Sequence, residues 1–296
     1  MGSLVGLSKD LLVSLALELE ISDVINLCLS CKKIKKNIYE NRNFWFKKLF
    51  KNFSDHPNLP EGKFIALNEK DKYKNLYKLL YGLTQLNQKL KLNQDIYQLY
   101  GLETLDLYNN QLRELPKETG LLQNLRYLYL SDNQLREIPK EIGQLQNLQQ
   151  LYLTHNRLIE IPKEINQLQN LQLLYLPHNQ LMEIAKEMTL LQNLQILYLN
   201  HNRLKEIPKQ ISQLENLQEL SLSYNQLEEI PKEIGLLENL QKLYLGYNQL
   251  RGLPKEIGSL QNLQELDLYN NQLTELPKEI SNLRNLQNLL GNFRKE

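Results

Sequence analysis

Residues 148–170 read LQQLYLTHNRLIEIPKEINQLQN, and the same 23-residue pattern recurs along two thirds of the chain. Its framework is LxxLxLxxNxLxxLPxxIxxLxN, and its first leucine returns without a slip at Leu102, Leu125, Leu148, Leu171, Leu194, Leu217, Leu240, Leu263 and Leu286. A repeat period of about 20–50 residues is typical of solenoids, in which each unit buries its apolar side chains against the next one. The sequence therefore predicts a stack of eight full repeats from residue 102, with partial units at both ends.

Within each repeat the segment LxLxx predicts a short strand. Leu151 and Leu153 point to one side of such a strand and Tyr152 to the other, because strand side chains alternate. Strands of successive repeats are expected to pair in parallel, and the half that starts at the proline to return along the convex side as an irregular or short helical segment. The pattern resembles the leucine-rich repeat family, which implies a horseshoe-shaped α/β solenoid with a parallel concave sheet.

The ninth repeat position is asparagine in all eight full repeats, at residues 110, 133, 156, 179, 202, 225, 248 and 271. A buried amide can bond the backbone groups that a turning chain leaves open. We therefore expect these asparagines to form a hydrogen-bonded ladder inside the solenoid.

Aromatic side chains recur at two positions of the predicted concave face. One set is Tyr129, Tyr152, Tyr175, Tyr198 and Tyr244, and the other, beside the asparagine column, is His155, His178, His201, Tyr224 and Tyr247. Rigid aromatic rings anchor many protein contacts, so these residues predict a strip that binds a target protein. The alternative is that tandem duplication copied a harmless tyrosine.

The three histidines of that strip also raise the question of a metal site. A straight row of imidazoles has poor tetrahedral geometry, and no cysteine or carboxylate column completes it, so we expect no metal; hydrogen bonding or a pH response fits better. The unit 171–193 departs most from the repeat, with Pro177 after its strand and Ala185 in place of the usual proline. Local distortion and neutral drift both remain open as explanations.

The amino-terminal region predicts a small helical module. Leucines at helical spacing in LSKDLLVSLALEL (residues 7–19) are followed by Asp23-Val24, by SCKKI at 30–34 and by Asn43-Phe44-Trp45. This order resembles an F-box over about residues 7–49, in a style similar to divergent F-boxes of large DNA viruses. Ser8 and Ile34 depart from the family pattern, which has a proline and a tryptophan there.

An F-box implies docking on a Skp-type adaptor, which joins it to a cullin complex. The resemblance assigns adaptor contacts to Leu7, Leu11, Leu12, Leu15, Leu19, Val24, Leu27, Cys31, Ile34 and Trp45. It implies that the chain is a substrate-recognition subunit of an SCF-type (Skp-cullin-F-box) ubiquitin ligase, and that it works in the cytoplasm, or in a host cytoplasm or nucleus if the source is viral.

Cys28 and Cys31 stand in CxxC spacing within NLCLSCKKIKK. Zinc would need two further ligands, and a redox pair would need exposure at a helix start, so buried helical cysteines fit better. The formal net charge of +1 does not favour binding to nucleic acid or to an anionic membrane. The lysines after Cys31 have no interleaved aromatic residues, so they do not indicate a nucleic-acid site either. The apolar amino terminus is interrupted by charges, so no membrane span or signal peptide is expected.

We therefore expect three parts in an α+β chain: an F-box-like helical module at 1–53, a helical linker and cap at 54–91, and the solenoid at 92–296. Tyr73, Leu76, Leu80 and Leu83 predict an amphipathic helix in the linker. No catalytic residue and no cofactor are expected. The competing hypothesis is a non-catalytic binding module or decoy whose amino-terminal helices only cap the solenoid; a catalytic ligase fits worst, because no further domain follows the repeats.

Overall fold

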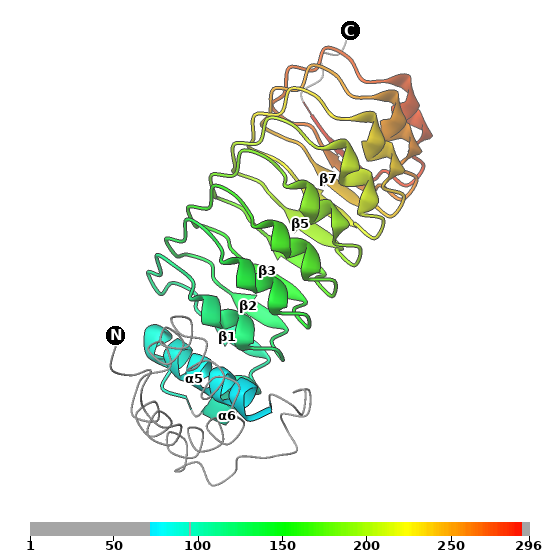
Figure 1. Ribbon diagram of the computed structural model, residues 1–296. Helices are drawn as coiled ribbons and strands as arrows, with labels where there is room; N and C mark the ends of the chain where they lie inside the picture. Colours follow the sequence, from blue (N-terminus) through cyan, green and yellow to red (C-terminus); the bar gives the residue numbers. More distant parts are fainter. Residues whose placement is uncertain (1–71, 95, 292–296) are drawn as a thin grey trace, which may run out of the picture. The chain divides into compact units, whose positions relative to one another are not determined.

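The computed structural model describes residues 72–94 and 96–291 (Figure 1). The chain divides into two compact units at residues 88 and 89. In the first unit the predicted linker helix is present as α5 (Lys72–Leu90), and Leu80, Leu83 and Leu86 on it are buried. The predicted F-box-like module at 1–53 lies outside the described residues.

The second unit is a solenoid built on one parallel sheet. Its nine strands pair in chain order: β1 (Thr104–Asp106), β2 (Tyr127–Tyr129), β3 (Gln150–Tyr152), β4 (Leu173–Tyr175), β5 (Ile196–Tyr198), β6 (Glu219–Ser221), β7 (Lys242–Tyr244), β8 (Glu265–Asp267) and β9 (Asn288–Leu290). Partners in neighbouring strands stand 23 residues apart, as Leu128, Leu151 and Leu174 do. The parallel sheet predicted from the repeat is confirmed, and the ninth, partial unit contributes a strand of its own.

Leucines of the framework form the core between the sheet and the opposite side. Leu151 and Leu153 are at most 1% exposed, whereas Tyr152 between them is partly exposed. The last strand differs: all three residues of β9 are exposed, and Leu290 is 57% exposed. Among the nine described strands, core packing is thus weakest at β9.

Short 3-10 helices form the side opposite the sheet (Figure 1). They are η4 (Lys117–Leu121), η5 (Lys140–Gln144), η6 (Lys163–Gln167), η7 (Lys186–Leu190), η8 (Lys209–Gln213), η9 (Lys232–Leu236), η10 (Lys255–Ser259) and η11 (Lys278–Asn282). All but η7 follow a proline, whose fixed φ suits the residue before a helix. Ahead of them, α6 (Ile96–Tyr100) is an α-helix, so the partial unit that contains Leu99 does not repeat the 3-10 geometry.

The predicted asparagine ladder is present inside the solenoid. Asn179 is typical: its Nδ2 donates to the carbonyl oxygens of Leu153 at 2.9 Å and Leu176 at 3.1 Å, and its Oδ1 accepts from the backbone N–H of Leu158 at 3.0 Å. The equivalent bonds recur at the other ladder positions from residue 133 to 271. Asn110 is the exception, because it is exposed and donates to the carbonyl of Tyr108 instead.

A second asparagine column closes each repeat, at residues 124, 147, 170, 193, 216, 239, 262 and 285. Its side chains are exposed, and each Nδ2 donates to the carbonyl oxygen 24 residues earlier, as Asn170 does to Gln146 at 2.8 Å. This column links consecutive repeats at the turn between the 3-10 helix and the strand. No role is predicted for this column from the sequence, although the last position of the repeat pattern is a recurrent asparagine.

The unit 171–193 is not distorted. Ala185 has φ −56° and ψ 131°, close to the values of −63° and 143° at Pro162 and of −66° and 142° at Pro208 in the flanking repeats. Strand β4 pairs in register on both sides. The backbone of this repeat therefore follows the others even though its sequence departs from them.

Candidate functional site

The outward-pointing residues of the strands form one surface, here called the strand face, which is the face that the sequence predicts to be concave. The predicted tyrosines lie on it at the third residue of their strands. Ring centroids of Tyr129, Tyr152 and Tyr175 are 4.8 Å apart in succession, with interplanar angles of 19° and 14°. One tyrosine per repeat thus forms a row of stacked rings, because the distance between neighbouring parallel strands matches the distance between the ring centroids.

The second predicted set forms a tighter stack beside the strand face. His155, His178, His201, Tyr224 and Tyr247 follow one another with centroid distances of 4.0–4.1 Å and interplanar angles of 10–13°. We call this row the ring stack. Because the ring faces cover one another, the row presents mainly its ring edges to a partner. At one end the ring of Tyr247 meets that of Tyr269, with centroids 5.6 Å apart and an interplanar angle of 55°.

Each residue of the ring stack has left-handed backbone geometry, with φ between 53° and 57°. Asn109, Asp132 and Asn270 occupy the same repeat position with φ of 54°, 56° and 51°. Asparagine, aspartate and histidine tolerate this region better than other non-glycine residues, whereas tyrosine adopts it rarely. At Tyr224 and Tyr247 the stacking contacts offset part of the conformational cost, which is about 1–2 kcal/mol.

Two histidines of the ring stack, His178 and His201, favour the neutral form. Partial burial lowers the pKa of His178, and the neighbouring His201 and His155 lower it further, while Asp132 acts in the opposite direction. Burial likewise lowers the pKa of His201, with a smaller contribution from His155. A proton on one ring therefore disfavours a proton on the next one along the stack.

A hydrogen-bonded network joins β5, β6 and β7 on the strand face. The hydroxyl of Tyr198 donates to Glu219 Oε2 at 2.5 Å, and Lys242 Nζ lies 2.8 Å from Glu219 Oε1. Burial by itself would raise the pKa of Glu219, but the bonds from Lys242 and Tyr198 outweigh it and lower that pKa. Burial and the same carboxylate raise the pKa of Tyr198. Glu219 is consequently a fixed anion near neutral pH.

Ser221 interrupts the tyrosine row at β6, and it is 7% exposed. Tyr198, one strand earlier, is turned 66° from the ring plane of Tyr175 and reaches Glu219 on β6. On β7 the hydroxyl of Tyr244 donates in the same direction, to Glu265 Oε2 on β8 at 2.7 Å. The tyrosine row is thus stacked in its first half and tied to carboxylates in its second half.

The first residue of each strand also differs between the two halves of the face. Leu173 on β4 and Ile196 on β5 are register partners, and both are partly exposed. The same position carries Glu219, Lys242 and Glu265 on the next three strands. The middle of the strand face is therefore apolar, and the half nearer the carboxyl end of the chain is charged. The predicted aromatic strip did not include this division.

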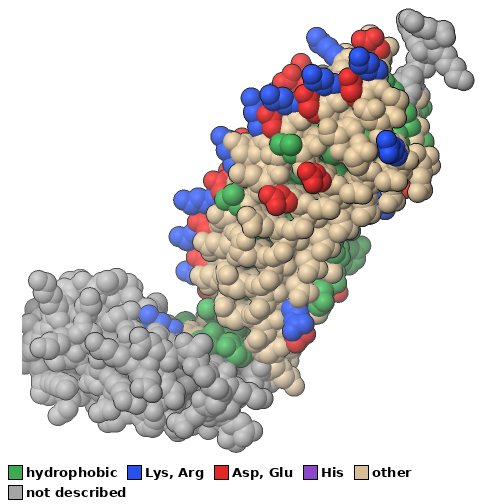
Figure 2. All heavy atoms as spheres, turned by 90° about the vertical axis from the view of Figure 1, so that its right-hand side faces the viewer, with side chains coloured by type: hydrophobic (Ala, Val, Ile, Leu, Met, Phe, Trp, Pro, Cys, Tyr) green, Lys and Arg blue, Asp and Glu red, His purple; other side chains and the backbone are tan. Residues whose placement is uncertain are grey.

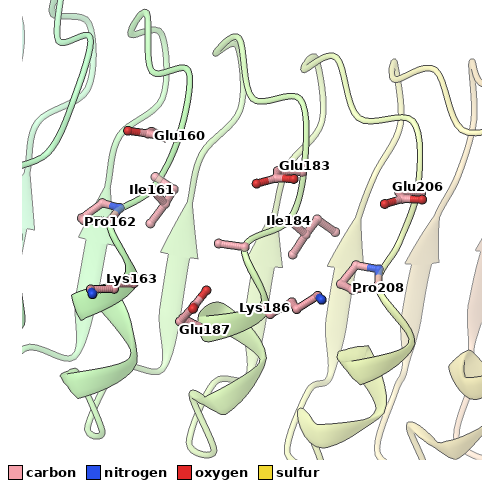
Figure 3. Close-up of a pocket in the computed structure, with 11 residues that line it drawn as sticks. Glu160, Ile161, Pro162, Lys163, Glu183, Ile184, Lys186, Glu187, Glu206 and Pro208 are labelled. Carbon is pink, nitrogen blue, oxygen red and sulfur yellow. The ribbon is translucent and has the colours of Figure 1, made fainter.

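A hollow of about 540 Å³ opens on the flank of the solenoid between the strands and the 3-10 helices (Figure 3). Ala185 lines it where seven of the eight repeats carry a proline, and Glu160, Glu183 and Glu206 stand in a row along its rim. Lys163 and Lys186 lie on its other side.

Charged side chains gather along one edge of the face shown in Figure 2, where acidic and basic groups alternate, while the rest of that face carries few charges. The described 3-10 helices of the repeats all begin with lysine, and all but η8 continue with glutamate. No broad patch of one sign is present on the face in view.

Two further observations concern the part of the chain that the structure describes. Within residues 72–94 and 96–291 no three His, Cys, Asp or Glu side chains converge as a metal site requires. Neither described α-helix combines the length and the apolar composition that a membrane span needs. The predicted adaptor-contact residues from Leu7 to Trp45 lie outside these ranges, and so does Cys28.

Family models for leucine-rich repeats match most of the solenoid: a leucine-rich repeat at 101–122, a leucine-rich repeat region at 117–203, a leucine-rich repeat at 192–250 and a two-copy model at 238–278. No F-box is found in residues 7–49. A comparison with curated protein sequences gives no significant match.

Several solved structures are similar. A leucine-rich-repeat protein of Leptospira interrogans is 45% identical with a TM-score of 0.57, over 69% of this chain and 59% of that one. The ectodomain of the plant receptor kinase GASSHO1 from Arabidopsis thaliana, in complex with CASPARIAN STRIP INTEGRITY FACTOR 2, is 39% identical with a TM-score of 0.55, over 61% of this chain and 23% of that one. Internalin C2 of Listeria monocytogenes is 26% identical with a TM-score of 0.59, over 72% of this chain and 92% of that one.

The chain thus spans 59% of the Leptospira protein and 23% of the plant ectodomain, so the match concerns the repeats rather than those whole proteins. The 23-residue period, the nine parallel strands, the internal asparagine ladder and the matched family models agree. This chain belongs to the leucine-rich repeat proteins, with a solenoid of the kind that serves protein interaction.

Proposed function

We propose that the protein is a non-catalytic binding module that holds a partner protein on its strand face. The observation that carries this proposal is the pair of ordered aromatic rows, the stacked tyrosines of β2–β4 and the ring stack beside them. Rings fixed by stacking lose little side-chain entropy on binding, so they suit a protein contact. The plant ectodomain in complex with CASPARIAN STRIP INTEGRITY FACTOR 2 is a precedent for a related solenoid with a bound molecule.

The test uses a substitution that the chain itself contains. Ser221 stands in the tyrosine row, so Tyr152→Ser and Tyr175→Ser together remove two rings without placing a foreign residue in a strand. The wild type should capture a partner protein from a lysate of the source organism, and the double variant should fail to capture it. The matched control is Lys140→Ser with Lys163→Ser, two exposed residues at the start of η5 and η6. Equal capture by all three proteins, each folded by circular dichroism, would remove the proposal.

A more specific proposal concerns the amino-terminal module. The order of leucines, Asp23-Val24, Cys31 and Trp45 resembles an F-box, and a binding solenoid after an F-box is the arrangement of an SCF substrate receptor. In that role the chain supplies proximity and no chemistry: the module docks on a Skp-type adaptor while the strand face holds the target for ubiquitin transfer.

The adaptor proposal has its own test. Purified chain is mixed with a Skp-type adaptor, and the complex is measured for the wild type and for Leu11→Asp with Leu12→Asp. Binding by the wild type and loss in the variant are expected. If the folded wild type does not bind the adaptor, the chain is instead the simpler module or decoy, and the strand-face proposal is unaffected.

A further inference from the structure

The middle of the strand face is an unpartnered apolar surface. Leu173, Tyr175, Ile196 and Tyr198 occupy the two outward positions of β4 and β5, and all four are partly exposed. We call them the apolar cluster. At the first of these positions the other described strands carry Thr104, Tyr127, Gln150, Glu219, Lys242, Glu265 and Asn288. Leu173 and Ile196 are thus the only aliphatic pair at this position among the nine described strands. The cluster is a specific departure from an otherwise polar column.

The strands next to it carry fixed charge. We call β6–β8 the charged strands, because their outward-facing residues include Glu219, Lys242, Glu265 and Asp267. These residues carry three carboxylates and one ammonium, which leaves two negative charges uncompensated within the set. Glu219 is held by Tyr198 and Lys242, Glu265 by Tyr244, and Asp267 Oδ1 accepts the backbone N–H of Tyr269 at 2.9 Å. These carboxylates are held in position before any partner arrives.

On this basis we propose that the partner segment is an extended peptide that places an apolar side chain on the apolar cluster and a lysine or arginine over the charged strands. The proposal deepens the proposed function and rests on it, since it assigns the chemistry of the partner to the same face. Charge complementarity selects a basic residue, and the apolar cluster selects the anchor beside it.

The spacing between the two parts defines the motif. From the middle of β4–β5 to β7, which is the middle of β6–β8, there are two and a half strand steps, or about 12 Å at 4.8 Å per step. An extended peptide advances about 3.3 Å per residue, so four residues span about 13 Å and side chains at i and i+4 point the same way. The partner segment therefore reads apolar-x-x-x-basic, or the reverse order if it runs in the opposite direction.

The test measures the binding of synthetic fluorescent peptides to the full chain by anisotropy. One peptide carries leucine and, four residues later, lysine; its reverse, a version with glutamate for lysine and a version with alanine for leucine complete the panel. The leucine–lysine peptide, in one of its two directions, should bind about tenfold or more tightly than the glutamate and alanine versions. Raising the salt should weaken that preference.

Matched variants assign the preference to residues. Glu265→Gln with Asp267→Asn should abolish discrimination against the glutamate peptide, whereas Glu206→Gln with Glu229→Gln, two exposed carboxylates outside the strand face, should leave it intact. Leu173→Gln, which copies Gln150 of the neighbouring strand, should remove the preference for leucine over alanine. Equal binding of all peptides by the wild type would overturn the inference.

Failure of the inference differs from failure of the proposed function. If Tyr152→Ser with Tyr175→Ser abolishes partner capture but the peptides are not discriminated, the strand face binds a partner of different chemistry. If that double variant leaves capture unchanged, the proposed function itself fails.

Discussion

His178 and His201 stack face to face with ring centroids 4.0 Å apart, and both sit in the left-handed backbone region. Parallel strands bring successive repeats to about 4.8 Å, and the tighter ring distance shows that the side chains lean into contact. Two imidazoles at this distance cannot both take a proton without mutual repulsion. The ring stack therefore couples proton binding to the surface proposed to hold a partner.

Stability should fall as the pH falls below 6.5. The pKa of His178 and of His201 is lowered in the folded protein, so the unfolded chain binds more protons than the folded chain from about pH 6.5 downward, and the free energy of unfolding decreases through that window. Because both rings are partly exposed, the loss should be about 1 kcal/mol or less. Urea unfolding at pH 7.5 and pH 5.5 measures it.

The control for this pH effect is His178→Asn with His201→Asn. Asparagine occupies the same left-handed position at Asn109 and Asn270, and it does not titrate. The double variant should lose less stability than the wild type between pH 7.5 and pH 5.5. An unchanged pH dependence would mean that other groups cause it.

Removing an asparagine of the internal ladder should lower the free energy of unfolding much more than removing one of the exposed asparagines that close each repeat. Asn179→Ala leaves the carbonyls of Leu153 and Leu176 and the N–H of Leu158 without their side-chain partner inside the solenoid, at a cost of about 2–4 kcal/mol. Asn170→Ala removes one exposed bond and should cost less than about 1 kcal/mol. Urea unfolding compares the two. Equal losses would show that burial does not decide the difference.

The fold of the repeats follows from the sequence because every unit repeats the same local requirements. The strand at Leu151, an irregular or short helical segment after Pro162 and the ladder at Asn179 were all predictable, since their leucine, proline and asparagine recur at fixed positions. The relation of Tyr198 to Glu219 was not predictable, because it joins residues of two repeats at positions that vary. Repeat periodicity predicts the backbone, whereas contacts between variable positions decide the surface.

The left-handed geometry of the ring stack shows the same limit. Asn109, Asp132 and Asn270 indicate positive φ at this repeat position, because asparagine and aspartate are enriched there. Tyr224 and Tyr247 at the same position indicate the opposite, because tyrosine rarely adopts positive φ. The strand-face residues lie where the sequence predicts, and their role as a binding surface stays a prediction. The adaptor contacts from Leu7 to Trp45 lie outside the described residues.

Close packing of neighbouring 3-10 helices should make some glycines in these helices costly to replace. A Cβ built on Gly143 would stand 2.6 Å from the carbonyl oxygen of Glu164 and 2.7 Å from Oε1 of Gln167, so Gly143→Ala should cost about 1–3 kcal/mol. At Gly252 a Cβ meets nothing within 4 Å, so Gly252→Ala should be neutral or slightly stabilising. Thermal unfolding measures both. Similar melting temperatures for the two variants would contradict the packing argument.

Ala185→Pro should stabilise the protein by about 0.4–1 kcal/mol. The residue already has φ −56° and ψ 131°, close to the φ −58° and ψ 135° of Pro116 at the equivalent position, and the ring would restrict the unfolded chain more than the folded one. It would also fill part of the hollow that Ala185 lines. The matched control, Pro208→Ala in the next repeat, should destabilise by a similar amount for the opposite reason. Urea unfolding of both variants gives the sign of the change in the free energy of unfolding. A destabilised Ala185→Pro would contradict the prediction and show that the proline ring displaces neighbouring atoms.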